Sequence, residues 1–181
     1  MKLKPSAYLI LGMLRGGVET GYSIKRAVDR STRFFWAASL AQVYPELANL
    51  AEHGFIESSD DPHGARPRKV YRLTAKGSRA LDAWLQSART PGFEFRDEGM
   101  LRLFFADGLN REDALALVRR LRTTAEELDE SFREEILPLA ESAPDLGRRY
   151  PLIVARWGAD YLAWRARWLA DLESELSDPP R

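Results

Sequence analysis

Apolar residues recur at helical spacing in three successive segments near the start of the chain. We expect helices over about residues 5–15, 20–31 and 39–53, because apolar side chains recur there every three or four positions. The pair Gly16-Gly17 ends the first helix, and Gly54 stands where a glycine commonly follows a helix. The chain is therefore predicted to begin with a three-helix unit.

Two features inside this unit are unusual. Pro45 falls past the first turn of the third helix, where it removes one backbone hydrogen bond. Either that helix begins nearer Tyr44, or its first turn is distorted. Between the second and third helices, the run Phe34-Phe35-Trp36 is too hydrophobic for a free loop, so we expect it to pack inward.

A β-hairpin and a fourth helix are expected next. Residues 55–58 and 69–73 are predicted strands, joined by a polar segment that holds prolines and a glycine. Residues 74–85 form the fourth helix, with Thr74 as its N-cap. Three helices followed by a hairpin are typical of a winged helix-turn-helix, in which the third helix enters the major groove and the hairpin reaches the neighbouring backbone or minor groove.

The remainder of the chain is helical after a turn-rich boundary at residues 87–92. Three further helices are expected, at about residues 97–107, 110–139 and 151–176. The fold class is thus mainly α. Residues 1–87 are predicted to form a winged helix-turn-helix DNA-binding domain, and residues 88–181 an all-helical dimerisation and possible effector domain.

Charge divides the chain at the same place. Residues 1–87 contain 13 Lys and Arg against 8 Asp and Glu, whereas residues 88–181 contain 14 against 19. The formal net charge of zero therefore joins a basic half, suited to DNA phosphates, to an acidic half that is repelled by them.

The sequence gives no support for an enzyme, a metal-binding protein or a membrane protein. The chain has no cysteine, and its only histidines, His53 and His63, lie near no residues that would form a triad or a metal site. No apolar run is long enough to span a membrane. The N-terminal apolar stretch is interrupted by Gly12 and Arg15, so we interpret it as a helix rather than a targeting signal. We expect no enzyme, cofactor, metal or membrane association, and a cytoplasmic location.

Several segments of the first half resemble the PadR-like transcriptional regulators. They occur in the family's order and are SAYLILGML at 6–14, GYSIK at 21–25, VYPEL at 43–47, LAEHGFI at 50–56, RPRKVYRLTAKG at 66–77 and LDAWL at 81–85. The resemblance implies a homodimer that presents two recognition helices to a palindromic operator. It also implies a repressor relieved by a small aromatic or amphipathic effector. By length and pattern, the second half is similar to the larger helical dimerisation domain of one branch of this family.

The third helix departs from the family in its charge. Members often carry basic residues after the Tyr-Pro pair, but here Ala48 and Asn49 stand there, and residues 39–53 contain no Lys or Arg. Base readout would then depend on neutral polar side chains, and charge on the second helix and the hairpin. The candidate DNA-binding residues are Lys25, Arg26, Ser39, Gln42, Tyr44, Asn49, Arg66, Arg68 and Lys69.

Interpretations of these residues without a role in DNA binding stay open. Tyr44 could simply cover the helix surface, and Lys25 and Arg26 could form only a solvated face. The lack of Lys and Arg in the third helix also permits an alternative function, a winged-helix protein-interaction module without sequence-specific DNA binding.

One face of the last helix carries an aromatic stripe, made by Trp157, Tyr161, Trp164 and Trp168. Flat rings could form an effector pocket. Rings at this spacing are also typical of a dimer core or of packing against other helices. The arginines nearby could bind a carboxylate effector but fit an outer face better; they are Arg156, Arg165 and Arg167. The acid pair Asp97-Glu98 is interpreted as solvated helix surface.

Overall fold

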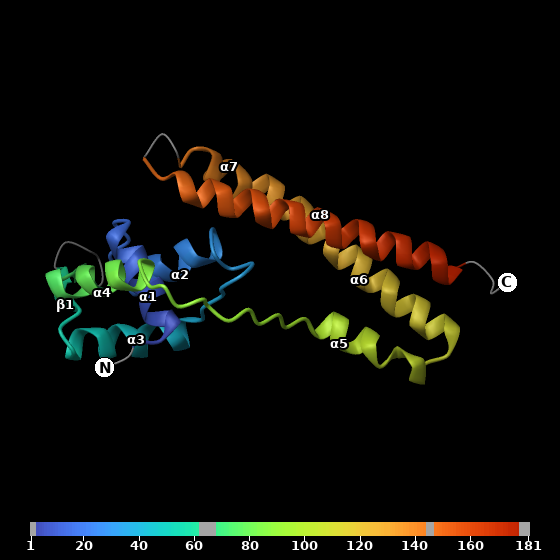
Figure 1. Cartoon of the computed structure of the whole chain (residues 1–181), viewed down its shortest axis with the longest axis horizontal. Helices are drawn as coiled ribbons and strands as arrows, with labels where there is room; N and C mark the ends of the chain where they lie inside the picture. The colour runs from blue at the N-terminus through green and yellow to red at the C-terminus, as the bar shows by residue number, and fades with distance from the viewer. Residues whose placement is uncertain (1–2, 62–67, 144–146, 178–181) are drawn as a thin grey trace. The chain divides into compact units, whose positions relative to one another are not determined.

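The computed structural model describes residues 3–61, 68–143 and 147–177. The chain divides into two compact units, Met1–Pro91 and Gly92–Arg181. The elements of the first unit, labelled in Figure 1 where there is room, are α1 (Pro5–Arg15), α2 (Gly21–Asp29), α3 (Leu40–Glu52), β1 (Ile56–Asp61), β2 (Arg68–Leu73) and α4 (Ala75–Leu85). Those of the second unit are α5 (Glu98–Phe104), a 3₁₀ turn (Ala106–Gly108), α6 (Arg111–Ser131), a π-helical turn (Phe132–Ile136), α7 (Leu137–Glu141) and α8 (Arg149–Ser177).

The first unit has a winged-helix core made by its helices and the hairpin. The largest side chains that are fully buried there are Ile10, Leu11, Ile24, Leu47, Leu50 and Ile56, with Val28 and Val43 beside them. Strands β1 and β2 pair antiparallel, with Ile56 opposite Leu73. The Tyr71 backbone N–H donates to the Glu19 carbonyl at 2.7 Å, so the turn between α1 and α2 anchors the base of the hairpin.

Helix α3 runs continuously through Pro45. It begins at Leu40, with Ser39 as N-cap, so a start nearer Tyr44 is wrong. The Val43 N–H donates to the Ser39 carbonyl at 3.0 Å, which is the regular bond of a first turn. Pro45 removes only its own N–H from the ladder, and the rest of the helix tolerates that loss.

Two of the three aromatic residues before α3 do not pack inward as expected, whereas Phe34 is half-buried. Phe35 is 47% exposed and Trp36 is 43% exposed. Two hydrogen bonds within the loop set its backbone path. The Trp36 N–H donates to the Thr32 carbonyl at 2.6 Å, and the Thr32 hydroxyl donates to the Trp36 carbonyl at 3.1 Å. This turn leaves the rings of Phe35 and Trp36 outside a core that the helices and the hairpin already fill.

The second unit is built on the pairing of α6 with α8, which lie side by side (Figure 1). The side of α8 that is buried carries mostly small residues, Ala155, Gly158 and Ala159, with Leu162 and Leu169. Small residues let two helix backbones approach closely. The large rings of α8 therefore lie on its other side.

Two helices of this unit differ from their predicted lengths. The helix expected at 97–107 ends at Phe104 and continues as the 3₁₀ turn. The helix expected at 110–139 ends at Ser131 and passes through the π-helical turn into α7. Pro138 explains the second interruption, because it has no N–H to donate to the Glu134 carbonyl inside that turn.

Candidate nucleic-acid interface

The outward face of α3 carries no Lys or Arg. Val43, Leu47 and Leu50 are buried, whereas Tyr44 is 48% exposed and Ala48 is also exposed. Such a face can offer apolar contact to thymine methyl groups and a few hydrogen-bond donors. It supplies no positive charge.

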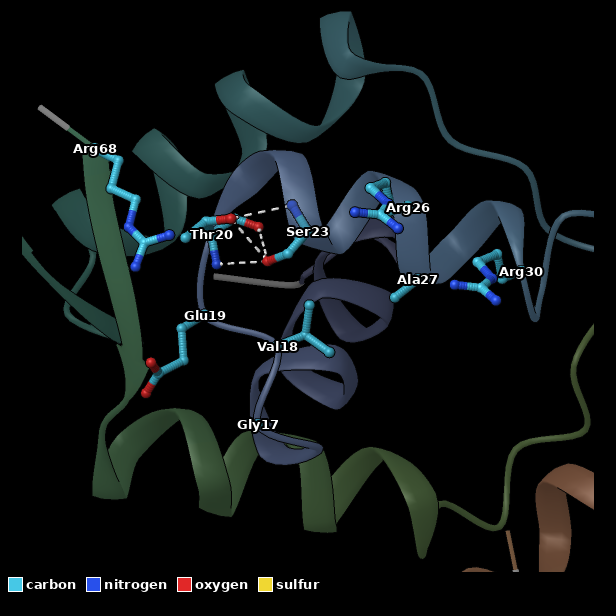
Figure 2. Close-up of a pocket in the computed structure, with 9 residues that line it drawn as sticks. All are labelled: Gly17, Val18, Glu19, Thr20, Ser23, Arg26, Ala27, Arg30 and Arg68. Atoms are coloured by element: carbon cyan, nitrogen blue, oxygen red, sulfur yellow. Dashed lines mark hydrogen bonds between the residues drawn. The ribbon is translucent and has the colours of Figure 1, made fainter. Parts of the chain in front are cut away.

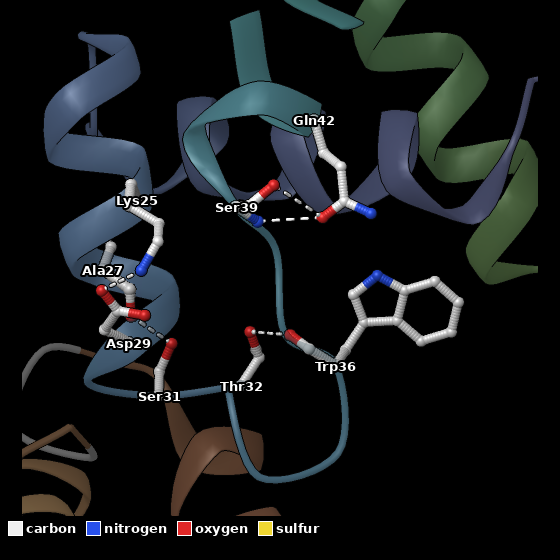
Figure 3. A network of polar contacts seen from close by, with 8 residues as sticks. All are labelled: Lys25, Ala27, Asp29, Ser31, Thr32, Trp36, Ser39 and Gln42. Atoms are coloured by element: carbon white, nitrogen blue, oxygen red, sulfur yellow. Dashed lines mark hydrogen bonds and ion pairs between the residues drawn. The ribbon is translucent and has the colours of Figure 1, made fainter. Parts of the chain in front are cut away.

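The Gln42 side chain caps the start of its own helix. Its side-chain oxygen Oε1 accepts from the Ser39 backbone N–H at 2.9 Å and from the Ser39 hydroxyl at 3.2 Å (Figure 3). Reading an adenine bidentately needs both the oxygen and the NH₂ group of a glutamine. While this cap is intact, Gln42 can only donate from its NH₂ group to a base or a phosphate.

Asn49 is held away from the outward face. Its Nδ2 donates to Glu46 Oε1 at 3.1 Å, and Glu46 Oε2 accepts from the Ser6 hydroxyl at 3.0 Å. These bonds tie α3 to α1, and Asn49 is half-buried. The structure therefore places Asn49 in a bracing role, which the sequence did not reveal because Ser6 is distant along the chain.

Tyr44 lies directly on the first residue of α2. A Cβ added at Gly21 would lie 2.6 Å from Tyr44 Cε1, so only glycine leaves room for the ring in this position. Tyr71 on β2 is close by. Burial raises its pKa above the usual value, and the neighbouring Tyr44 raises it further. Tyr44 thus stands where α2, α3 and the hairpin meet.

The predicted basic residues have different surroundings. Lys25 forms an ion pair with Asp29 one turn along α2, which offsets its charge (Figure 3). Arg26 is exposed, as are Arg68 and Lys69 at the start of β2. Arg66 lies outside the described residues, as does His63.

A residue that the sequence reasoning missed joins this group. Arg30 lies one turn after Arg26 and, with Arg26 and Arg68, lines a cleft of about 440 Å³ (Figure 2). The i, i+4 spacing of Arg26 and Arg30 was the available signal, since residues so spaced share one side of a helix.

The aromatic stripe of α8 lies at the surface of its unit. Trp157 and Trp164 are each 52% exposed. Tyr161 stacks on Trp157 with ring centroids 6.0 Å apart, and Trp164 stacks on Trp168 at 6.4 Å. The four rings form one continuous row along the helix.

Beside this row, an ion pair corrects two expectations. Arg165 Nη2 lies 2.6 Å from Asp97 Oδ2, and their side chains are only 17% and 12% exposed. Asp97 also caps α5, since its Oδ1 accepts from the Met100 N–H at 3.1 Å. Arg165 is therefore not on an outer face, and Asp97 is not solvated surface. Burial raises the pKa of the adjacent Tyr161, and Arg165 partly offsets that rise.

Comparison with known proteins decides the family. Residues 10–83 match the Transcriptional regulator PadR-like family, and residues 95–177 match a family described as Virulence activator alpha C-term. The negative transcriptional regulator PadR of Bacillus subtilis is 30% identical over 177 residues, which cover 93% of this chain and 97% of that protein. This chain belongs to the PadR-like family of transcriptional regulators.

Solved structures agree along nearly the whole PadR-like chain. The crystal structure of Bacillus subtilis PadR in complex with operator DNA has a TM-score of 0.80 at 28% identity, covering 96% of this chain and 100% of that one. The same regulator in complex with p-coumaric acid has a TM-score of 0.73 at 28% identity, covering 95% and 98%. The Vibrio cholerae virulence activator AphA, with a TM-score of 0.71 at 24% identity and covering 94% and 97%, shares the fold.

The family and the mainly α, winged-helix fold class are thus confirmed. No helix among the described residues has both the length and the apolar content to cross a bilayer. The individual DNA-binding and effector-binding residues stay predictions.

Proposed function

We propose that this PadR-like protein is a transcriptional repressor that binds a palindromic operator as a homodimer and acts by binding rather than catalysis. One observation carries the proposal: the agreement over 96% of the chain, at a TM-score of 0.80, with a PadR bound to operator DNA. Under this proposal, residues 1–87 contact DNA and residues 88–181 hold the two copies together.

Sequence readout belongs to the exposed face of α3, which has no Lys or Arg. Tyr44 reaches outward from the meeting point of α2, α3 and the hairpin, and Gln42 offers its NH₂ group. Positive charge comes instead from Arg26 on α2 and from Arg68 and Lys69 on β2. Phosphate contacts of this kind position a protein on DNA, while base contacts select the sequence.

The dimer is proposed to form through the aromatic stripe. The stripe continues toward the start of α8 through Val154 and Tyr150, and the whole row is spaced alternately by four and three residues. That spacing is the seam of a coiled coil. Tyr150 is 75% exposed in the single chain. An exposed apolar row of this length is typical of an interaction surface, and the same row on a second copy of α8 would be self-complementary to it.

We place the effector near the same row. The relative from Bacillus subtilis has been solved in complex with p-coumaric acid, a small aromatic acid. Flat rings such as Trp157 and Trp164 suit stacking against an aromatic effector. Its binding would relieve repression by changing how the two copies present their DNA-binding units.

Fluorescence anisotropy with a labelled duplex from upstream of the protein's own gene tests the proposal. We expect binding to that duplex at least a thousandfold tighter than to a scrambled duplex of equal length, on the order of the usual specificity ratio. Equal binding to both duplexes at low salt, by a protein shown to be dimeric, would exclude a sequence-specific regulator.

The absence of Lys and Arg from α3 is the one observation that favours a second function, a protein-interaction module. That function predicts a stoichiometric partner on purification. It also predicts a partner affinity that does not change when Arg68 and Lys69 are replaced by alanine. Loss of duplex binding in this double variant favours the DNA-binding function.

A further inference from the structure

The cleft beside α2 is open, basic and shared by two elements. Arg26 and Arg30 line it from α2, and Arg68 lines it from the start of β2 (Figure 2). The turn between α1 and α2 forms its floor, including Glu19 and Thr20. Its volume of about 440 Å³ and its open shape suit an extended polar chain better than an enclosed small molecule.

The hydroxyl groups of the cleft are already satisfied. Thr20 and Ser23 cap α2 reciprocally: the Ser23 N–H donates to Thr20 Oγ1 at 3.0 Å, and the Thr20 N–H donates to Ser23 Oγ at 3.0 Å. The Ser23 hydroxyl itself donates to the Thr20 carbonyl at 2.9 Å. The donors of α2 best able to receive a ligand are therefore the guanidinium groups of Arg26 and Arg30.

The arginines of α2 lack the neutralisation that their neighbour has. Lys25 pairs with Asp29, but in the described part of the chain no carboxylate pairs with Arg26 or Arg30. Glu19, the acidic residue of the cleft, lies 3.6 Å from Arg72 Nε outside it. Like charges at i, i+4 on a helix repel each other slightly, so an anion between helix and hairpin would relieve that repulsion.

We infer that this cleft is a track for the sugar-phosphate backbone of one DNA strand, with Arg30 and Arg68 on neighbouring phosphates and Arg26 adding positive charge beside Arg30. Arginine forks match phosphate oxygens in geometry as well as charge. Because Arg68 belongs to the hairpin and the others to α2, the strand would fix the angle between the two. This inference rests on the proposed DNA-binding function.

Methylphosphonate scanning of the operator tests it. Each duplex carries one neutral phosphate, and affinity is measured for the full-length wild-type protein and for the Arg30→Ala and Arg68→Ala variants. We expect each variant to bind operator and non-specific duplex alike about tenfold more weakly, because backbone contacts carry no sequence information. Each variant should also become insensitive to neutralisation of a single phosphate, and the two positions should be neighbours on one strand.

Salt dependence gives a second readout. Removal of one phosphate-binding arginine should reduce the slope of log affinity against log salt by about 0.9 per bound protomer. The double variant should therefore show about twice that reduction. Unchanged slopes, or insensitive phosphates on opposite strands, would overturn the track.

Two control variants separate the cleft from general charge and folding effects. Arg79→Ala on α4 removes one exposed charge from the same unit but outside the cleft, and it should leave the slope and the phosphate pattern unchanged. Arg30→Lys keeps the charge and removes the fork, so its affinity should fall less than that of Arg30→Ala and its slope should stay that of the wild type. Thermal unfolding of all variants checks that each is folded.

The outcomes also separate this inference from the proposed function. Wild-type protein that binds operator specifically, together with arginine variants that bind equally well, overturns the track alone. Wild-type protein without specific binding overturns both. Inorganic pyrophosphate tests a free phosphate source: if it raises the melting temperature of the wild type only, while operator affinity is unchanged in the double variant, the cleft serves a free phosphorylated compound and the track is wrong.

Discussion

The two units of this chain build their buried interfaces from side chains of different size. The Met1–Pro91 unit encloses Ile10, Leu47 and Leu50 completely within its own fold. In the Gly92–Arg181 unit, small residues of α8 face α6, and the tryptophans of the aromatic stripe stay at the surface. The first unit therefore has a core of large side chains, whereas the second leaves a row of rings exposed, which a second copy covers under the proposed function.

The largest effect should come from the enclosed core of the first unit. Leu47 is fully buried, so Leu47→Ala should cost about 2–5 kcal/mol of unfolding free energy, through reduced burial and a residual cavity. Leu85→Ala on α4 is the matched control, because Leu85 is 62% exposed and its truncation should change stability by less than about 0.5 kcal/mol. Urea unfolding measures both, and equal costs would show that the core is not the enclosed one described.

The next effect should appear in association rather than in folding. Trp164→Ala removes a central ring of the stripe and should raise the dimer dissociation constant by about 30-fold or more, as expected of a buried tryptophan at an interface centre. Sedimentation velocity over a concentration series measures it. Trp84→Ala is the control, because Trp84 is similarly exposed but stacks on Tyr8 in the first unit. If both variants dimerise like the wild type, the stripe is not the interface.

A smaller effect should arise where α2 meets α3. Gly21→Ala would push the Tyr44 ring aside, because the new Cβ would lie 2.6 Å from Tyr44 Cε1. We expect operator affinity to fall by about 1 kcal/mol, the lower end for one base contact. In a Tyr44→Ala background the same substitution should have no further effect, since the clash is gone. Additive losses in this double-mutant cycle would mean that Gly21 acts independently of Tyr44.

The smallest effect concerns alkaline pH. Burial raises the pKa of Tyr71 above its usual 10.0, so the folded state favours the neutral phenol. The stability that this provides is complete below pH 10.0 and is lost as pH rises through the folded pKa. Tyr71→Phe should therefore flatten the decline of stability above pH 10.0, and Tyr22→Phe at an exposed position should not. Denaturant unfolding at a series of alkaline pH values compares them.

The sequence was sufficient for the fold because the signals of the fold are local. The spacing of Ile10, Leu47 and Leu50 sets the buried sides of α1 and α3, and Thr74 accepts from the Gly77 N–H at 3.1 Å as a helix cap. The start of α3 at Leu40 also follows a local signal, the Ser39-x-x-Gln42 capping box, which outweighs Pro45.

The candidate site was predicted less well, because its chemistry is settled by residues far apart in the chain. The sequence predicts Asn49 as a DNA contact, but in the structure its side chain donates to Glu46, which also accepts from Ser6. The sequence predicts Asp97 as solvated surface, but in the structure its Oδ2 lies 2.6 Å from Nη2 of Arg165 on α8. Arg30 and Arg68 line one cleft, although 38 positions separate them in the chain, so sequence spacing alone does not relate them. Local spacing reports which face a residue occupies, whereas its partners come from tertiary contacts.

The absence of lysine and arginine from α3 also has a consequence for the time the protein spends on the wrong DNA. Random chromosomal sequence holds a regulator almost entirely by phosphate charge. Under the proposed function, a recognition helix without Lys or Arg would make each such stop brief. The cell would then keep more of this protein unbound and exchanging between sites, so that occupancy of the operator would follow a change in effector quickly.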